Sequence, residues 1–168
     1  MKVKKLTWLS LALSLSLILS YLETLISLPF SVVGMKLGLA NMVVLVVLYT
    51  TGVKDAALVS ASRVCLSALL FGSWLSLAYA AAGAVCSFLS MWVLKKGKFS
   101  PWAVSMVGGV VHNIAQISVA SLLFRQSAVF SLLPPLLVAG VTTGLFVGIV
   151  ASLFLHYIQK TELQKHLS

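Results

Sequence analysis

PWAVSMVGGVVHNIAQISVASLLF, residues 101–124, contains no charged side chain and begins with proline, which is favoured in the first turn of a helix. A transmembrane helix needs about 20 predominantly apolar residues, so this run is long enough to cross a bilayer. Similar apolar runs recur on both sides of it. We predict an all-α membrane protein, a bundle of six transmembrane helices over residues 6–28, 35–51, 55–71, 74–94, 101–124 and 134–156.

The composition supports this prediction. Of the 168 residues, 60% are hydrophobic and only 9% are charged, whereas soluble domains have about 45–50% apolar and about 25% charged residues. Low charge with high hydrophobicity also excludes a disordered chain. Six spans use roughly 120 residues, so we expect one transmembrane domain over residues 1–168, without room for a separate catalytic domain.

The distribution of basic residues predicts the orientation. Twelve Lys and Arg face three acidic residues, and most lie in short blocks between apolar runs, which favours the positive-inside rule over nucleic-acid binding. With a cytoplasmic N-terminus, only Lys36 and Arg125 lie outside. The inner ends would carry Lys2, Lys4, Lys5, Lys54, Lys95, Lys96, Lys98, Lys160 and Lys165. Both termini are therefore expected in the cytoplasm, which requires an even number of spans.

Three local features bear on this topology. The N-terminal lysines and the apolar run after them resemble the start of a signal peptide, but no convincing cleavage site follows, so we expect an uncleaved first helix. The loop at 28–34 is apolar and is either a lid over the bundle or an interfacial segment. Cys65 and Cys86 lie in apolar runs without metal-ligand spacing, and we expect small packing residues rather than a disulfide.

Two stripes of small residues indicate close helix contacts, because small side chains let helix backbones approach in lipid. One consists of Gly140, Gly144 and Gly148. The other consists of Ala12, Ser16 and Ser20 in the first span. Either stripe can pack within the bundle or form a docking face for another membrane protein. The first span is the better candidate for docking, since a terminal helix can be peripheral.

Several polar residues fall within the predicted spans, where ionisable groups are costly and usually face a cavity or one another. A rise of about 1.5 Å per residue places them at overlapping depths in the middle and outer half of the membrane. We predict a hydrated, outward-open pocket for a small polar or anionic molecule. The predicted binding residues are Glu23, Lys36, Asn41, Arg63, His112, Asn113 and Gln116.

A structural role is the alternative for each of these groups. Glu23 could form a clamp with Arg63 or Lys36, and Lys36 could instead extend to the membrane interface. His112 and Asn113 could join helices by hydrogen bonds.

The sequence lacks motifs of enzymes and pumps. It has no P-loop, no Gly-rich nucleotide fingerprint and no Asp-rich motif for Mg²⁺, and no set of nucleophile, base and acid is suggested. We therefore expect no enzymatic activity, no cofactor and no metal site, and any ATP coupling has to come from partner proteins.

The run GMKLGLAN at 34–41 resembles the Gx transporter family, which is also labelled heptaprenyl diphosphate synthase component I in bacterial genomes. Glu23 upstream, Ala56 to Arg63 downstream and VHNIAQ at 111–116 contribute to the resemblance, which covers nearly the whole chain. The family looks like the substrate-binding S components of energy-coupling factor (ECF) transporters.

The resemblance implies a six-helix S component in the bacterial plasma membrane, without ATPase activity. It would bind a vitamin-like solute on the outer side, under the loop that joins the first two helices. It would dock through the first helix on a T component, which carries two cytoplasmic ATPases. S components typically have alanines four apart there, and Ala12, Ser16 and Ser20 match that pattern more loosely.

Two other functions stay open. The chain could be a membrane accessory subunit for heptaprenyl diphosphate or quinone synthesis, or a scaffold in a membrane redox assembly. The sequence does not specify the solute: flavins, thiamine-like vitamins and isoprenoid precursors all fit, and metals fit least because the histidines are scattered.

Overall fold

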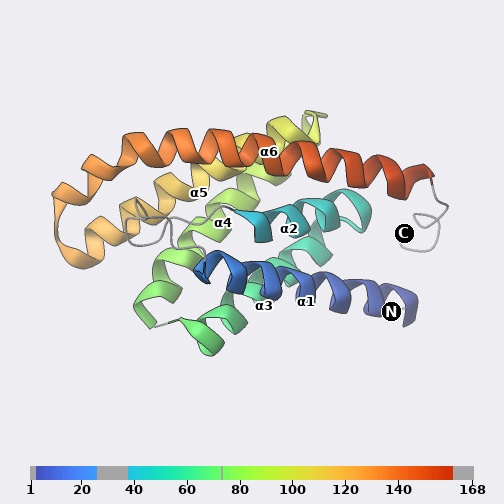
Figure 1. Cartoon of the computed structure of the whole chain (residues 1–168), viewed down its shortest axis with the longest axis horizontal. Helices are drawn as coiled ribbons and strands as arrows, with labels where there is room; N and C mark the ends of the chain where they lie inside the picture. Colours follow the sequence, from blue (N-terminus) through green and yellow to red (C-terminus); the bar gives the residue numbers. More distant parts are fainter. Residues whose placement is uncertain (1–2, 26–37, 73, 161–168) are drawn as a thin grey trace.

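The computed structural model describes residues 3–25, 38–72 and 74–160, and helices make up nearly all of this part of the chain (Figure 1). Its α-helices are α1 (Val3–Leu25), α2 (Leu39–Thr50), α3 (Val53–Phe71), α4 (Trp74–Lys96), α5 (Pro101–Phe124) and α6 (Leu133–Lys160). A short 3₁₀ helix, η1 (Ser127–Leu132), joins α5 to α6 and was not predicted. The all-α prediction is confirmed, and α5 has the predicted bounds.

Within the described residues, four helical stretches are long and apolar enough to cross a membrane: Val3–Glu23, Leu77–Lys96, Pro101–Phe124 and Ser127–Lys160. The protein is therefore a multi-pass membrane protein. α2 has 12 residues, a length of about 18 Å, whereas the hydrocarbon core of a bilayer is about 30 Å thick. α3 carries Lys54, Asp55 and Arg63. Length and composition thus support four crossings and leave α2 and α3 as shorter or more polar members of the bundle.

α2 is the central helix of the bundle. All residues from Val43 to Leu48 are buried, and a helix that is apolar on every side has to be enclosed by protein or lipid. α2 contacts α1, α3, α5 and α6, and Figure 1 shows it between α1 and α6. Its burial makes both of its ends dependent on side chains from neighbouring helices.

Glycines bring α5 and α6 close together. A Cβ atom at Gly144 would lie 2.8 Å from Cα of Met106, and one at Gly148 would lie 2.5 Å from Cα of Trp102. A Cβ at Gly140 would lie 3.2 Å from the backbone of Gly109. The predicted stripe on α6 therefore lies directly against the backbone of α5, where no larger side chain fits without displacing a helix.

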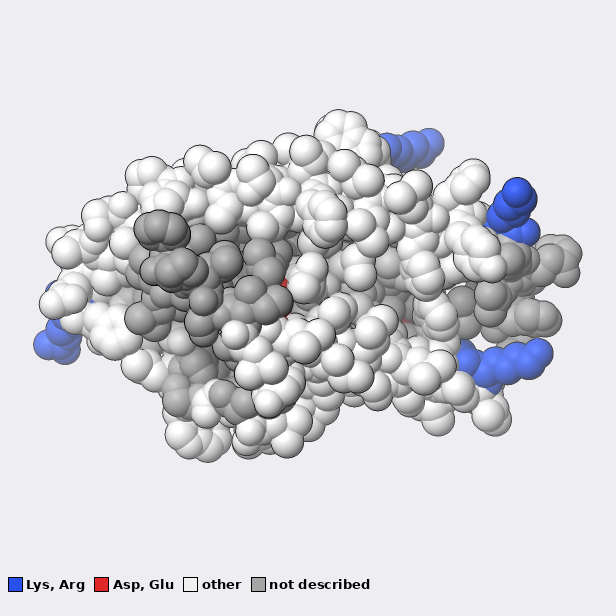
Figure 2. Space-filling view, viewed as in Figure 1, with Lys and Arg blue, Asp and Glu red and all other residues white. Residues whose placement is uncertain are grey.

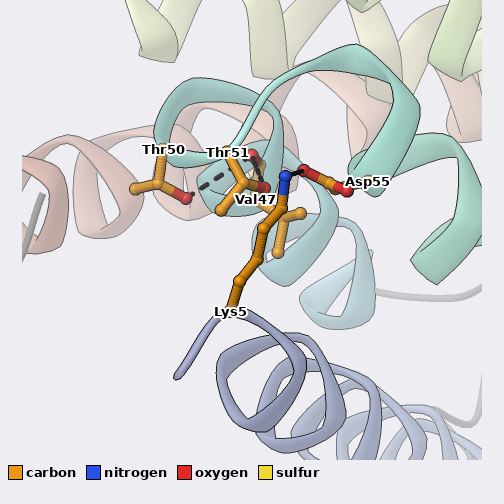
Figure 3. Close-up of polar contacts among 5 residues, drawn as sticks. All are labelled: Lys5, Val47, Thr50, Thr51 and Asp55. Atoms are coloured by element: carbon orange, nitrogen blue, oxygen red, sulfur yellow. Dashed lines mark hydrogen bonds and ion pairs between the residues drawn. The ribbon is translucent and has the colours of Figure 1, made fainter. Parts of the chain in front are cut away.

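Polar contacts join four helices at one end of the bundle. Lys5 at the start of α1 forms an ion pair of 2.8 Å with Asp55 at the start of α3 (Figure 3). Nζ of Lys95, in α4, donates to the carbonyl of Leu48 near the end of α2 at 2.5 Å. The Tyr49 hydroxyl donates to the carbonyl of Phe99, between α4 and α5. Cations at the C-terminal end of a helix stabilise its unpaired carbonyl groups.

The basic residues gather toward the ends of the molecule. On the face drawn in Figure 2, Lys and Arg side chains lie toward the two ends of the long axis, chiefly at the end that carries both chain termini in Figure 1. Arg125 follows α5, at the end opposite to the contacts of Lys5 and Lys95. This arrangement agrees with the charge pattern that the orientation prediction uses.

The small residues of α1 are buried, whereas the two cysteines are exposed. Ala12, Ser16 and Ser20 are buried inside this chain, with Ser16 0% exposed, which agrees with the packing alternative for this stripe; docking through it stays a prediction. The reason for this burial is that α1 packs on α2 and α3, which turns these small side chains inward and leaves leucines such as Leu11 and Leu15 exposed. Cys65 and Cys86 are free thiols, as expected, but they are exposed on the surface of the bundle instead of packed inside it.

We predict that Gly148→Ala destabilises the protein, because the new methyl group meets the α5 backbone at Trp102. Overpacking costs about 1–3 kcal/mol, measurable as a lower midpoint of unfolding in detergent. Gly108→Ala is the matched control, since its Cβ meets mainly the flexible side chain of Met91. Equal stability of the two variants would contradict the close α5–α6 contact.

Candidate functional site

Glu23 provides the cap at the N-terminus of α2. The preceding residue, Gly38, adopts a left-handed conformation with φ 77° and has no side chain that could cap the helix. Instead, the backbone N–H of Leu39 donates to Oε1 of Glu23 at 2.5 Å. A carboxylate is favourable at this position, because the N-terminal end of a helix carries a partial positive charge. The contact ties the last turns of α1 to the first turn of α2.

Arg63 extends this polar cluster to α3. Its Nη2 donates to Oδ1 of Asn41 in the first turn of α2 at 3.1 Å, and the opposite charge of Glu23 acts on its guanidinium. Arg63 is 7% exposed and Glu23 is 6% exposed. Two opposite charges and an amide from three helices are therefore brought together inside the bundle, where their interaction is weakly screened.

A small cavity of about 20 Å³ lies beside this cluster, between α2, α4, α5 and α6. This volume has room for one group the size of a water molecule. The polar residues that line it are Asn41, Ser87, Ser105, His112, Asn113 and Thr143. Asn41 belongs to both the cavity and the cluster, so it connects Arg63 to the cavity wall.

The α5 side of the site is held from two directions. Nδ2 of Asn113 donates to the carbonyl of Leu136 in α6 at 2.7 Å, which fixes the amide against that helix. His112 and Gln116 face α4 together, since a Cβ at Gly83 would lie 2.8 Å from side-chain atoms of each. The i, i+4 spacing predicts that these two residues share a helix face, and both do contact the same residue of α4, Gly83.

Three deeply buried side chains have polar atoms without a hydrogen-bond partner in the described part of the chain. They are Nε of Arg63, Nε2 of Gln116 and Oγ of Ser87. Buried polar groups are normally paired, because leaving one unpaired costs about 1–3 kcal/mol. Their concentration on α3, α4 and α5, next to the cavity or to its lining residues, indicates a place where a further molecule can contribute acceptors.

The structure brings six of the seven predicted binding residues into this region. Glu23, Asn41 and Arg63 form the cluster on α1, α2 and α3. The cavity joins Asn41 to His112 and Asn113, and Gln116 lies beside His112 on Gly83. Lys36, the apolar loop at 28–34 and the Glu23–Lys36 pair lie outside the described residues.

Sequence reasoning missed the small polar residues of the site. Ser87 is 1% exposed and lines the cavity together with Ser105 and Thr143. In the sequence these residues do not differ from the serines and threonines on other faces of the helices. Gly83 was missed for the same reason, and only the packing of α4 on α5 marks it as the floor under His112.

The profile of the heptaprenyl diphosphate synthase component I family matches residues 12–154. The chain belongs to this family. The match extends from α1 into α6 and includes Glu23, Asn41, Arg63, His112 and Gln116, so the family predicted from the sequence is confirmed. Searches of curated proteins and of solved structures gave no match. The name of the heptaprenyl diphosphate synthase component I family denotes one component of a synthase.

We predict that Glu23 and Arg63 stabilise each other. Glu23→Gln keeps an oxygen for the Leu39 N–H but removes the charge, and Arg63→Gln removes the opposite charge. Each single variant should lower stability, and the double variant should lose less than the sum, with a coupling of about 0.5–3 kcal/mol. The measurement is a double-mutant cycle from unfolding midpoints in detergent, and strict additivity would show that the two charges act independently.

Proposed function

We propose that the protein is the substrate-binding membrane (S) component of an ECF-type importer. It captures a small polar or vitamin-like solute on the outer side and does not itself hydrolyse ATP. The observation that carries this proposal is the buried cluster of Glu23, Asn41 and Arg63 next to a polar cavity. Ionisable groups at membrane depth are retained mainly where they bind a substrate, an ion or one another.

The orientation follows from the lysines. Lys5 and Lys95 lie at the end where α1 and α3 begin and where α2 and α4 end, and the positive-inside rule assigns that end to the cytoplasm. We infer six spans in a bacterial plasma membrane, with both termini inside. The N-terminus of α2, and with it Glu23 and Asn41, then lies toward the outer side.

Transport requires movement that this chain does not energise. The cavity of about 20 Å³ admits only one small group of a solute, so loading has to separate helices around α2. We propose that a T component with two cytoplasmic ATPases drives the reorientation of the loaded bundle. The described carboxylates support a role without catalysis, since Glu23 caps α2 and Asp55 binds Lys5.

The family name favours a second candidate, a membrane accessory subunit of heptaprenyl diphosphate synthesis. Under this alternative, a soluble prenyl synthase binds the protein and turns over faster in its presence. A pull-down with the purified membrane protein, followed by an assay of chain elongation, separates the two candidates. Stimulated elongation without solute binding would favour the accessory subunit.

We predict that Arg63→Ala and His112→Ala each abolish solute binding while the protein stays folded, because both residues belong to the polar site. The readout is mass spectrometry of small molecules that co-purify with the detergent-solubilised protein. Lys54→Ala and His156→Ala are matched controls, because Lys54 is an exposed cation on the same helix as Arg63 and His156 is an exposed histidine. If both site variants retain the solute, the site assignment is wrong.

We also predict that uptake depends on partners. Proteoliposomes with this chain alone should bind the co-purified solute but not accumulate it, whereas addition of a T component and its ATPases should give ATP-dependent accumulation. Accumulation by the chain alone would contradict an S-component role.

A further inference from the structure

We propose that the site recognises an oxyanion on its solute, a carboxylate or a phosphate, through the guanidinium of Arg63. The inference rests on the proposed solute-binding function and specifies which chemical group of the solute Arg63 contacts. It excludes cationic solutes and metal ions as the species that Arg63 contacts.

The first argument is the hydrogen bonding of Arg63. One nitrogen of its guanidinium, Nη2, donates to Asn41, whereas no described oxygen accepts a hydrogen bond from Nε. Nε and Nη2 lie on the same edge of the guanidinium, the edge that binds two oxygens of a carboxylate or phosphate at once. Arg63 is only 7% exposed, yet one of the two nitrogens on this edge, Nε, has no hydrogen-bond partner among the described residues.

The second argument is that the surrounding unpartnered groups are also donors. Gln116 is 6% exposed with Nε2 unpartnered among the described residues, and Ser87 is 1% exposed with its hydroxyl unpartnered there. Nε2 of Gln116 can only donate and therefore needs an acceptor oxygen, which a metal ion or an ammonium group cannot supply, and the hydroxyl of Ser87 can donate to an oxygen as well. Ser87 and Asn41 both line the cavity, so the oxygens of one small group can approach both residues.

The third argument concerns charge. Glu23 is the only carboxylate among the described residues of the cluster, and its Oε1 accepts the Leu39 N–H at the positive end of α2. The partial charge of that helix end, about +0.5, offsets part of the Glu23 charge. The guanidinium is therefore not fully neutralised by Glu23, and a bound oxyanion completes the compensation.

The test measures the unfolding midpoint of the full chain in detergent with sodium formate or inorganic phosphate as probes. Formamide and sodium chloride at equal concentration and ionic strength are the neutral and salt controls. We expect a saturable rise with at least one oxyanion, and the comparison of formate with phosphate identifies which group is preferred. Arg63→Gln should remove the rise, with apparent affinity weaker by about tenfold or more.

Lys54→Gln, an exposed cation on the same helix, is the matched control and should respond like the unmodified protein. If Arg63→Gln does not fold, Arg63→Lys keeps the charge but lacks the bidentate edge, and it should still weaken the response. Equal stabilisation by chloride, or an unchanged response of either Arg63 variant, would overturn the proposal.

The outcome can be separated from that of the proposed function. A co-purified solute that is cationic, or whose binding is unaffected by Arg63→Gln, would overturn the oxyanion inference and leave the S-component role standing. A formate or phosphate response that depends on Arg63, in a protein that carries no solute and supports no uptake with partners, would support the inference and contradict the role.

Discussion

A helix that begins inside a membrane protein has N–H groups that lipid cannot satisfy, and this constraint organises the bundle around α2. Gly38 offers no side chain to the first turn, so the carboxylate of Glu23 accepts the hydrogen bond from Leu39. The contact requires the end of α1 to lie at the start of α2. The carboxylate of Glu23 is also a negative charge in the interior, and it interacts with the positive charge of Arg63.

The opposite end of α2 is stabilised in a complementary way. Lys95 donates to the carbonyl of Leu48, and Tyr49 reaches the turn between α4 and α5. A short, largely apolar helix is thus held at both ends by polar side chains from other helices. The buried middle of α2 separates the polar cluster at its N-terminus from the contacts of Lys5 and Lys95 at the opposite end of the bundle.

The glycine contacts between α5 and α6 determine how the rest of the site is formed. Close approach at Gly140 allows Asn113 to bind the Leu136 carbonyl, and the missing side chain at Gly83 leaves room for His112 and Gln116. Because Gly83 and Gly140 have no side chains, there is space at these positions for the polar side chains of α5. The site depends on backbone distances as much as on the chemistry of its side chains.

The sequence by itself determined the helices, the family and the ionisable residues that lie at membrane depth, because apolar length and charge are local properties of the chain. It did not determine which face of α1 is buried: Ala12, Ser16 and Ser20 are compatible with either packing or docking until α2 and α3 cover them. It also gave no reason to select Ser87 over other serines. Those features depend on which helix faces which, and in lipid that choice follows from close packing and hydrogen bonding between helices, which only the tertiary structure decides.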